Sequence, residues 1–454
     1  MTDIKQTVID QRAFFNSGRT KDIGFRIDQL KKLKNAIIKY EADIEKALFE
    51  DFGKCEFEAY ATEIGLIISG ITEFEKHLKA WARPKTVPKT FATFHAKSTI
   101  AYEPFGVSLI MSPWNYPVQL TLAPLIGAIA AGNTAVVKPS RFTPRTVAVM
   151  KKMIEENFSS DYIALFEGGR EVNEALLKER YDFIFFTGGT TVGKVVMSAA
   201  AQNLTPVVLE LGGKSPCIVD ETADIAKSAK SLCWGKFINA GQTCIAPDFV
   251  MAKREIVPAL LDALKSSIAR MYGENPQKSP DFPRIITPSH FERVSGLIDQ
   301  RKVFCGGQTD AASRYIAPTV LTDVTFDDKV MGEEIFGPVL PIIPYDDEDE
   351  MLRTLQAMET PLAYYLFSKD KKRVKKYLAM RSSGDAVVND TLIHITNPHL
   401  PFGGKGSSGM GAYHGRHSFE TFSHKRSVVY RSLKFDLPRY APYPKKFGFI
   451  KRFL

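Results

Sequence analysis

The stretch that decides the fold is YDFIFFTGGTTVGK, residues 181–194. Its first part, residues 181–186, is a run of apolar and aromatic residues that predicts a buried strand, and a helix is predicted after the glycine-rich turn. A glycine-rich turn between a strand and a helix presents backbone N–H groups and a helix dipole to a phosphate. The spacing GxTxxG differs from the common GxGxxG, and either alone is weak evidence because many such turns bind nothing.

Two similar transitions lie upstream. Residues 106–111 predict a strand that runs into SPWNYP, residues 112–117, before an apolar stretch typical of a helix. Asn115 therefore lies in a turn at a strand end, where its amide could donate to an oxyanion, although it could also merely satisfy the turn backbone. A second short strand ends at Lys138, which is placed to hold an anion or a ribose.

Cys244 is the cysteine whose surroundings suit chemistry. It follows NAGQT, residues 239–243, in which a glycine allows close approach of backbone to a substrate and polar residues replace an apolar strand. A thiol attacks carbon as the thiolate and needs such a polar, partly exposed setting. Glu210, at the start of ELGG, is a carboxylate that could serve the thiol. An inert structural thiol is the alternative for a cysteine considered alone.

Together these segments resemble the NAD(P)-dependent aldehyde dehydrogenase superfamily, and most closely its class 3 branch, which includes fatty-aldehyde and aromatic-aldehyde enzymes. The resemblance covers nearly the whole chain, with the matching blocks in the right order. The blocks are PWN (113–115), KPS (138–140), FTG (186–188), ELGGKSP (210–216), GQTC (241–244), EEIFGP (333–338), ND (389–390) and PFGG (401–404).

The resemblance implies a role for each of three residues in the reaction. Cys244 attacks the aldehyde carbon, and the Asn115 side chain and the Cys244 backbone N–H hold the oxyanion. Hydride transfer to the nicotinamide then leaves a thioester. Glu210 acts as the general base that activates the hydrolytic water, and the product is a carboxylic acid.

The resemblance also implies cofactor contacts, with NAD or NADP as the cofactor. Lys138 binds the adenosine ribose and Gly188 lies under the dinucleotide. Glu334 binds the nicotinamide ribose, and Phe336 packs against the nicotinamide. NAD-preferring relatives commonly have glutamate where this chain has Arg141, which could instead pair with the 2′-phosphate of NADP or turn to solvent.

The predicted fold class is α/β: an aldehyde dehydrogenase-like fold with a Rossmann-type cofactor domain, a second α/β catalytic domain and a small β oligomerisation element. Helical periodicity opens the chain, and alternating strand and helix signals run from about residue 101 to 209. The predicted domains are residues 1–80 and 101–209 for dinucleotide binding, 210–395 for catalysis, 81–100 and 396–430 for oligomerisation or bridging, and 431–454 as a basic-aromatic tail.

Length and composition agree with an enzyme of this kind. The 454 residues, 44% of them hydrophobic, suffice for two or three domains. The chain opens without an apolar leader, and its longest apolar runs are far short of the roughly 18 to 20 residues that span a bilayer, so we expect a cytoplasmic protein. Neither CxxC pairs nor clustered histidines occur, and no metal is expected.

The net charge of +9 raises the question of an anionic partner. The tail, residues 431–454, mixes basic and aromatic residues and could touch an anionic membrane peripherally or pack on a partner subunit. Nothing resembling a nucleic-acid-binding module accompanies the charge, so we expect no nucleic-acid partner. The family resemblance implies a homodimer with an aldehyde as its small-molecule partner.

Two other functions compete with NAD(P)-dependent aldehyde oxidation. A coenzyme-A-acylating dehydrogenase would use the same cysteine but typically lacks a carboxylate at the position of Glu210. A cysteine-dependent thioesterase or esterase would leave the cofactor residues unexplained. The resemblance suggests medium- or long-chain aliphatic, aromatic or polyene aldehydes as substrates. Tyr60, Trp114, Tyr116 and the aromatics near His394 are candidates to line an apolar entrance, although the same side chains could belong to the core.

Overall fold

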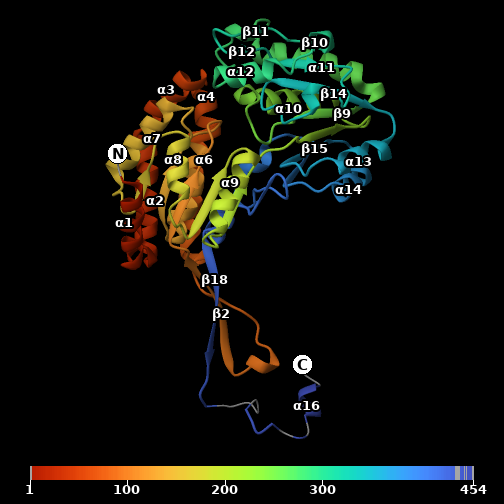
Figure 1. Ribbon diagram of the computed structural model, residues 1–454. Helices are drawn as coiled ribbons and strands as arrows, with labels where there is room; N and C mark the ends of the chain where they lie inside the picture. Colours follow the sequence, from red (N-terminus) through yellow and green to blue (C-terminus); the bar gives the residue numbers. More distant parts are fainter. Residues whose placement is uncertain (1–2, 435–439, 444, 446, 452–454) are drawn as a thin grey trace.

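The computed structural model describes residues 3–434, 440–443, 445 and 447–451. Two lobes lie side by side, and a narrow arm extends away from them (Figure 1). The α-helices are α1 (Ile4–Asn16), α2 (Ile23–Lys39), α3 (Glu41–Phe52), α4 (Glu56–Ala59), α5 (Gly65–Trp81), α6 (Gln119–Ala131), α7 (Pro144–Asn157), α8 (Arg170–Leu177), α9 (Thr190–Ala201), α10 (Ile225–Phe237), α11 (Val257–Tyr272), α12 (Pro288–Ser295), α13 (Glu348–Ala357), α14 (Lys371–Met380), α15 (Gly415–Thr421) and α16 (Gly448–Lys451).

The helical opening predicted from periodicity is confirmed. Asp22 caps α2 by accepting a hydrogen bond from the backbone N–H of Phe25, and the apolar residues Leu30, Leu33 and Ile37 are fully buried on one face. Between α4 and α5 the chain forms a π-helical turn, η2 (Tyr60–Ile64), which the apolar pattern did not predict. The apolar face of α2 packs against α5 and α6, and α6 in turn packs on the sheet of the first lobe.

The strands of the structure form two large sheets, a short pair and an arm. They are β1 (Lys85–Thr86), β2 (Ala96–Pro104), β3 (Val107–Met111), β4 (Thr134–Lys138), β5 (Ile163–Leu165), β6 (Phe183–Thr187), β7 (Val207–Glu210), β8 (Pro216–Val219), β9 (Phe249–Lys253), β10 (Val303–Cys305), β11 (Thr309–Asp310), β12 (Tyr315–Ile316), β13 (Thr319–Leu321), β14 (Val339–Tyr345), β15 (Ala363–Phe367), β16 (Asp385–Val388), β17 (Gly409–Met410) and β18 (Ser423–Arg431).

The first large sheet has the order β17-β7-β6-β3-β4-β5. Its members from β7 to β5 pair in parallel, and only β17 runs antiparallel, at the edge. Strands β3, β4 and β6 are buried along their whole length, as continuous apolar runs in a sheet covered on both faces should be. The second sheet, β10-β13-β14-β9-β8-β15-β16, is also mainly parallel. The predicted α/β fold is therefore confirmed.

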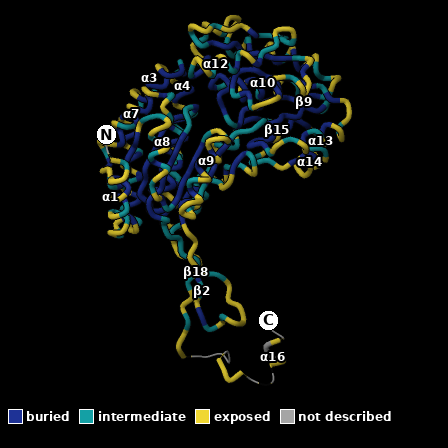
Figure 2. Tube along the Cα trace, viewed as in Figure 1, coloured by how far each residue is buried: buried dark blue, intermediate teal, exposed yellow. Residues whose placement is uncertain are grey.

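The arm consists of β1, β2 and β18, paired antiparallel in that order. β2 and β18 pair from Ala96 with Arg431 to Pro104 with Ser423, and they carry mainly exposed and half-buried residues away from the lobes (Figure 2). The glycine-rich segment 402–411 contributes β17 to the first sheet, although it lies within residues 396–430, the range assigned to the bridging element. The domain boundaries stay a prediction.

Two further features concern an acidic run and the membrane. The acidic run 346–350 opens α13, where Asp347 caps the helix by accepting from the N–H of Glu350. Among the residues that the structure describes, no helix is long and apolar enough to cross a bilayer. The tail, residues 431–454, was expected either to touch a membrane or to pack on a partner subunit, and part of it lies outside the described residues.

Candidate active site

Parallel strands bring the predicted residues to one edge of the first sheet. β3 leads into the turn that carries Asn115, β4 ends at Lys138, β6 ends just before Gly188 and β7 ends at Glu210. These strands are neighbours and run in the same direction, so their carboxyl ends meet. Four neighbouring strand ends therefore contribute polar groups to this edge of the sheet.

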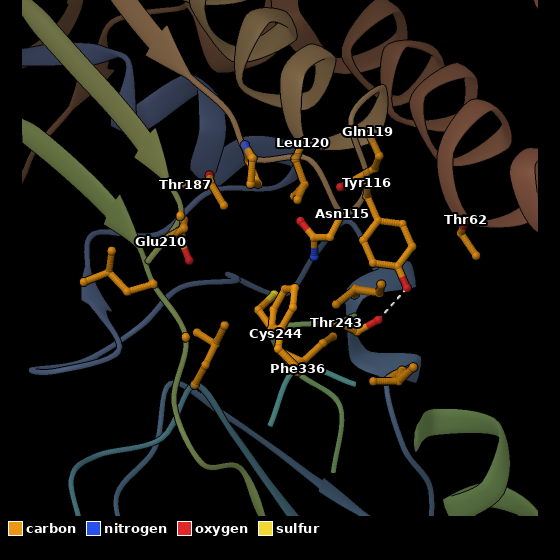
Figure 3. Close-up of a pocket in the computed structure, with 18 of the residues that line it drawn as sticks. Thr62, Asn115, Tyr116, Gln119, Leu120, Thr187, Glu210, Thr243, Cys244 and Phe336 are labelled. Atoms are coloured by element: carbon orange, nitrogen blue, oxygen red, sulfur yellow. Dashed lines mark hydrogen bonds between the residues drawn. The ribbon is translucent and has the colours of Figure 1, made fainter. Parts of the chain in front are cut away.

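A cavity of about 460 Å³ opens beside this edge (Figure 3). Most of the predicted site residues line it, whereas Lys138 and Arg141 do not. The lining members of that set are Asn115, Gly188, Glu210, Cys244, Glu334 and Phe336.

The loop before Cys244 has a strained backbone. Asn239 and Ala240 both adopt left-handed conformations, with φ of 52° and 51°, and Gly241 follows with φ of 75°. A side chain at Gly241 would lie 2.3 Å from the carbonyl oxygen of Gly337, so only glycine fits. Each non-glycine residue held in this region costs on the order of 1 kcal/mol or more. Contacts from the surrounding structure must therefore hold the loop in place.

Amide side chains supply part of that restraint. The Asn239 side chain donates to the carbonyl oxygens of Asn115 (2.8 Å) and Gln242 (3.1 Å), and the Gln242 side chain donates back to the Asn239 carbonyl (2.9 Å). Asn115 Nδ2 donates to the Gln242 carbonyl at 3.0 Å. An amide nitrogen carries two hydrogens, so the second can donate into the cavity, where the side chain is directed toward Cys244 (Figure 3).

The surroundings of Cys244 raise the pKa values of both Cys244 and Glu210. Burial, followed by the carboxyl groups of Glu334 and Glu210, raises the pKa of the Cys244 thiol to about 12. Burial, with Asp385 as the next cause, raises the pKa of Glu210 well above its ordinary value. Within the described part of the chain, neither carboxyl oxygen of Glu210 has a hydrogen-bond partner. Glu210 is thus a buried acid whose carboxyl oxygens are free to bind a water molecule and whose proton affinity is raised. Both properties suit a general base.

Glu334 and Phe336 form one wall of the cavity. Arg293 donates to the carbonyl oxygens of Glu334 (3.3 Å) and Ile335 (2.7 Å) and so fixes their backbone. The Phe336 ring meets Trp114 edge-on, with centroids 5.3 Å apart. Burial raises the pKa of Glu334 to about 8. A carboxyl group next to an aromatic face suits a ligand with ribose hydroxyls and a flat ring.

Lys138 and Arg141 form a cationic pair farther along the same edge. Lys138 is buried, its Nζ donates to the Pro139 carbonyl at 2.7 Å, and burial followed by Arg141 lowers its pKa to about 8. Arg141 is exposed and lies over the Phe142 ring, 5.2 Å from its centroid. The buried hydroxyl of Thr187, the last residue of β6, lacks a hydrogen-bond partner among the described residues. The residues present therefore fit a dinucleotide along the sheet edge.

Comparison with known proteins identifies the family. The model of the aldehyde dehydrogenase family matches residues 2–428. The chain belongs to the aldehyde dehydrogenase family. It is similar to the 4,4′-diaponeurosporen-aldehyde dehydrogenase of Staphylococcus aureus (strain NCTC 8325 / PS 47), with 47% identity over 100% of this chain and 99% of that protein. It is also 45% identical to a dimeric NADP-preferring aldehyde dehydrogenase of Rattus norvegicus, over 98% of this chain and 99% of the relative.

Solved structures of aldehyde dehydrogenases agree with the fold. The structure described as the substrate-bound state of Staphylococcus aureus AldH has a TM-score of 0.98 at 47% identity and covers 100% of both chains. An aldehyde dehydrogenase of Bacillus cereus has a TM-score of 0.85 at 26% identity, covering 94% of this chain and 88% of that one. The predicted class 3-like aldehyde dehydrogenase, an NAD(P)-dependent enzyme that oxidises aldehydes, is thereby confirmed.

The sequence did not predict all of this aldehyde dehydrogenase's cavity lining. Trp114 and Tyr116 line it as expected, whereas Tyr60 does not. The Tyr116 hydroxyl pairs with Thr243 Oγ1 at 2.7 Å, beside Cys244 (Figure 3). Part of the remaining lining comes from segments outside the family blocks, including Leu66, Trp234, Ile238, Leu392, Ile395, Tyr413 and His414.

Proposed function

We propose that this aldehyde dehydrogenase oxidises a long, lipophilic aldehyde to its carboxylic acid through a thioester on Cys244. The observation that carries the proposal is the meeting of Cys244, the Asn115 amide and the hydrogen-bond-free Glu210 carboxyl around one mainly apolar cavity. A nucleophile, an oxyanion donor and a base are the groups that acyl chemistry requires.

The reaction begins at the thiol. Cys244 releases its proton to solvent water and its thiolate Sγ bonds to the aldehyde carbon, while the Asn115 side chain and the Cys244 backbone N–H stabilise the resulting oxyanion. Such a donor is typically worth about 3 kcal/mol. When bound, NAD(P)+ supplies the hydride acceptor of the reaction. The acyl group is then held on Cys244 as a thioester.

Glu210 completes the cycle. Its carboxylate takes a proton from water, the water oxygen attacks the thioester carbon, and the carbon–sulfur bond breaks to return Cys244. Glu210 then releases the proton to solvent. The sum is aldehyde, water and NAD(P)+ converted to carboxylic acid, NAD(P)H and one proton. A coenzyme-A-acylating enzyme has no need for this base, and a simple esterase has no need for Glu334 and Phe336.

The lining of the cavity supports a lipophilic substrate. Leu66, Leu120 and Ile238 line it, and Trp234 both lines it and is 39% exposed, so apolar surface continues to the solvent. Burial of each methylene contributes about 0.8 kcal/mol. The relative named for diaponeurosporenal oxidation supports polyene aldehydes within this class.

An aldehyde series tests the proposed substrate class. Initial rates of NAD(P)H formation are measured for aliphatic aldehydes of increasing length, aromatic aldehydes and a polyene aldehyde. We expect kcat/KM to rise by about two- to fourfold per methylene until the cavity is filled, from the free energy of burial. A preference for short aldehydes would reject this substrate class while leaving aldehyde oxidation intact.

The position of Arg141 supports NADP as an efficient cofactor. Arg141 is exposed beside Lys138 at the end of β4, where a second cation can form charge-assisted hydrogen bonds to a 2′-phosphate. Arg141→Glu should lower kcat/KM for NADP by about 10- to 100-fold, since such bonds contribute about 1.5–3 kcal/mol, and leave that for NAD within a few fold. Steady-state kinetics with each cofactor measure the ratio.

Arg145→Glu is the matched control for the Arg141 variant. Arg145 is also a largely exposed arginine, in the first turn of α7, and lies 3.7 Å from the Glu50 carboxylate. Its reversal changes the net charge equally, so it should leave the NADP/NAD ratio near wild type. If Arg141→Glu and Arg145→Glu behave alike, Arg141 turns to solvent and does not select the cofactor.

We propose further that the protein is a cytoplasmic homodimer joined through its arm. The exposed apolar side chains Val429 (57%) and Tyr430 (62%) on β18 support this, because a partner's sheet could cover them. Peripheral membrane contact through the tail remains a second proposal, supported by the basic and aromatic residues of 431–454. Analytical ultracentrifugation and vesicle co-sedimentation of full-length and tail-truncated protein test these two points.

A further inference from the structure

A buried charged cluster lies behind the cavity, outside the set of residues that the reaction uses. Lys54 follows α3, Glu58 lies on α4 and Glu63 lies in the π-helical turn η2. Lys54 and Glu63 have no exposed surface, and Glu58 is 8% exposed. Charged side chains are expensive to bury unless each is paired and hydrogen-bonded, so their partners indicate what the cluster is for.

One side of the cluster holds the turn that carries Asn115. Lys54 Nζ lies 2.6 Å from Glu63 Oε1. The other carboxyl oxygen of Glu63 accepts the backbone N–H of Val118 at 2.8 Å, at the start of α6. Lys54 Nζ also lies 4.6 Å from the ring centroid of Tyr116. The ion pair therefore fixes the backbone on the carboxyl side of Asn115 and the ring next to it.

The other side of the cluster holds the loop that carries Cys244. Glu58 Oε1 accepts the backbone N–H of Asn239 at 2.9 Å in a buried setting. Asn239 is the first of the left-handed residues in that strained loop. The hydrogen bond from Glu58 therefore stabilises the strained backbone conformation at its first residue. Tyr116 joins the two sides, since its hydroxyl lies 2.7 Å from Thr243 Oγ1.

We propose that Lys54, Glu58 and Glu63 are positioning residues that hold the oxyanion turn and the nucleophile loop in register with each other. The inference rests on the proposed roles of Asn115 and Cys244. The cluster contributes no residue to the cavity lining, and its contacts are to the turn after β3 and to the loop before Cys244. Its loss should therefore act on aldehyde chemistry and leave cofactor binding unchanged.

The π-helical turn explains how one short segment can do this. In this turn the Gly65 N–H is bonded to the Tyr60 carbonyl, five residues earlier, where an α-helix would use four. The wider turn allows Glu58 and Glu63, which are five residues apart, to point to the same side. Both acids point inward, while Ala61 and Thr62 between them line the cavity. The same turn thus presents one face to substrate and another to the two catalytic loops.

Two substitutions of Glu58 separate positioning from charge. Glu58→Gln keeps an oxygen that can accept from the Asn239 N–H, and we expect kcat/KM for aldehyde within about threefold of wild type. Glu58→Leu keeps the size and removes the acceptor. We expect it to lower kcat/KM for aldehyde by about 100-fold, since small misplacement of reacting groups has effects of that order. The dissociation constant for NADP, measured by fluorescence titration, should change less than twofold in both.

A second readout reports the loop directly. Iodoacetamide alkylation of Cys244, relative to the half-buried Cys305 in the same molecule, is followed by peptide mass spectrometry. Glu58→Leu should change this ratio at least about threefold, whereas Asp51→Asn should not. Asp51 is a matched control because it is also buried and also accepts from backbone and side-chain donors, those of Thr146 at the start of α7.

The outcomes are distinct. Wild-type kcat/KM and alkylation ratio in Glu58→Leu would overturn the inference, as would an equal loss of NADP affinity. If Glu58→Leu does not fold, Glu63→Gln and Lys54→Met take its place, because each breaks the ion pair and should lower aldehyde kcat/KM without affecting NADP binding. Absence of aldehyde oxidation in the wild-type protein would instead reject the proposed function on which the inference rests.

Discussion

Cys244→Ala is expected to abolish aldehyde-dependent NAD(P)H formation, with a fall in kcat of at least about 10⁴-fold. Covalent attachment of the acyl group requires the sulfur, and among the described residues that line the cavity Cys244 is the one thiol. The other four cysteines lie elsewhere: Cys55 directly precedes α4, Cys217 and Cys233 are fully buried in the second lobe, and Cys305 ends β10. The rate is measured by absorbance of the reduced cofactor at saturating aldehyde.

Cys305→Ala is the control for the thiol variant. Cys305 is half-buried, as Cys244 is, and its removal should leave kcat unchanged. Binding of NADP should survive in both variants, because Cys244 contributes little to cofactor contacts along the sheet edge. More than a few per cent of wild-type activity in Cys244→Ala would contradict a thioester on this residue.

Local sequence pattern predicted the residues at strand ends well. The buried strand predicted in 181–186 is β6, shifted by a residue or two, and Lys138 is the last residue of β4. Apolar runs of this length identify strands of a parallel sheet, and a parallel sheet collects its carboxyl ends at one edge. The grouping of Asn115, Gly188 and Glu210 follows from those two facts.

Long-range contacts could not be predicted in the same way. Glu58 and Asn239 are separated by 181 positions, and nothing in either local pattern indicates that one accepts a hydrogen bond from the other. The π-helical turn was missed because an inserted residue breaks the 3.6-residue period on which helix prediction depends. The left-handed conformation of Ala240 likewise has no sequence signal, since alanine normally avoids it.

The structure also changes the interpretation of single residues. Tyr60 was a candidate for the substrate entrance, yet it is 44% exposed and outside the lining, while its neighbours Ala61 and Thr62 line the cavity. Asn389, from a family block, binds the backbone of Ser368 after β15: its side chain accepts from the Ser368 N–H at 2.9 Å and donates to the Ser368 carbonyl at 2.9 Å. A sequence motif thus predicts where a residue lies in the fold more reliably than it predicts which way the side chain points.

Glu210→Gln is expected to convert steady turnover into a single burst of NAD(P)H, about one equivalent per active site, followed by a rate at least about 100-fold slower. Glutamine has the size of the acid but cannot take a proton from water, so the thioester forms and is not hydrolysed. Stopped-flow absorbance measures the burst. Adding hydroxylamine, which attacks a thioester without needing a base, should restore continuous turnover.

The pH dependence provides an independent test of the same step. Because burial and Asp385 raise the pKa of Glu210, the wild-type rate should be full above that raised pKa and fall as the pH drops through it. Glu210→Gln should lack this acid limb. Asp385→Asn keeps the base and removes a neighbouring carboxyl, so it should show no burst and an acid limb at lower pH. A burst in Asp385→Asn, or the absence of a burst in Glu210→Gln, would show that Glu210 is not the general base.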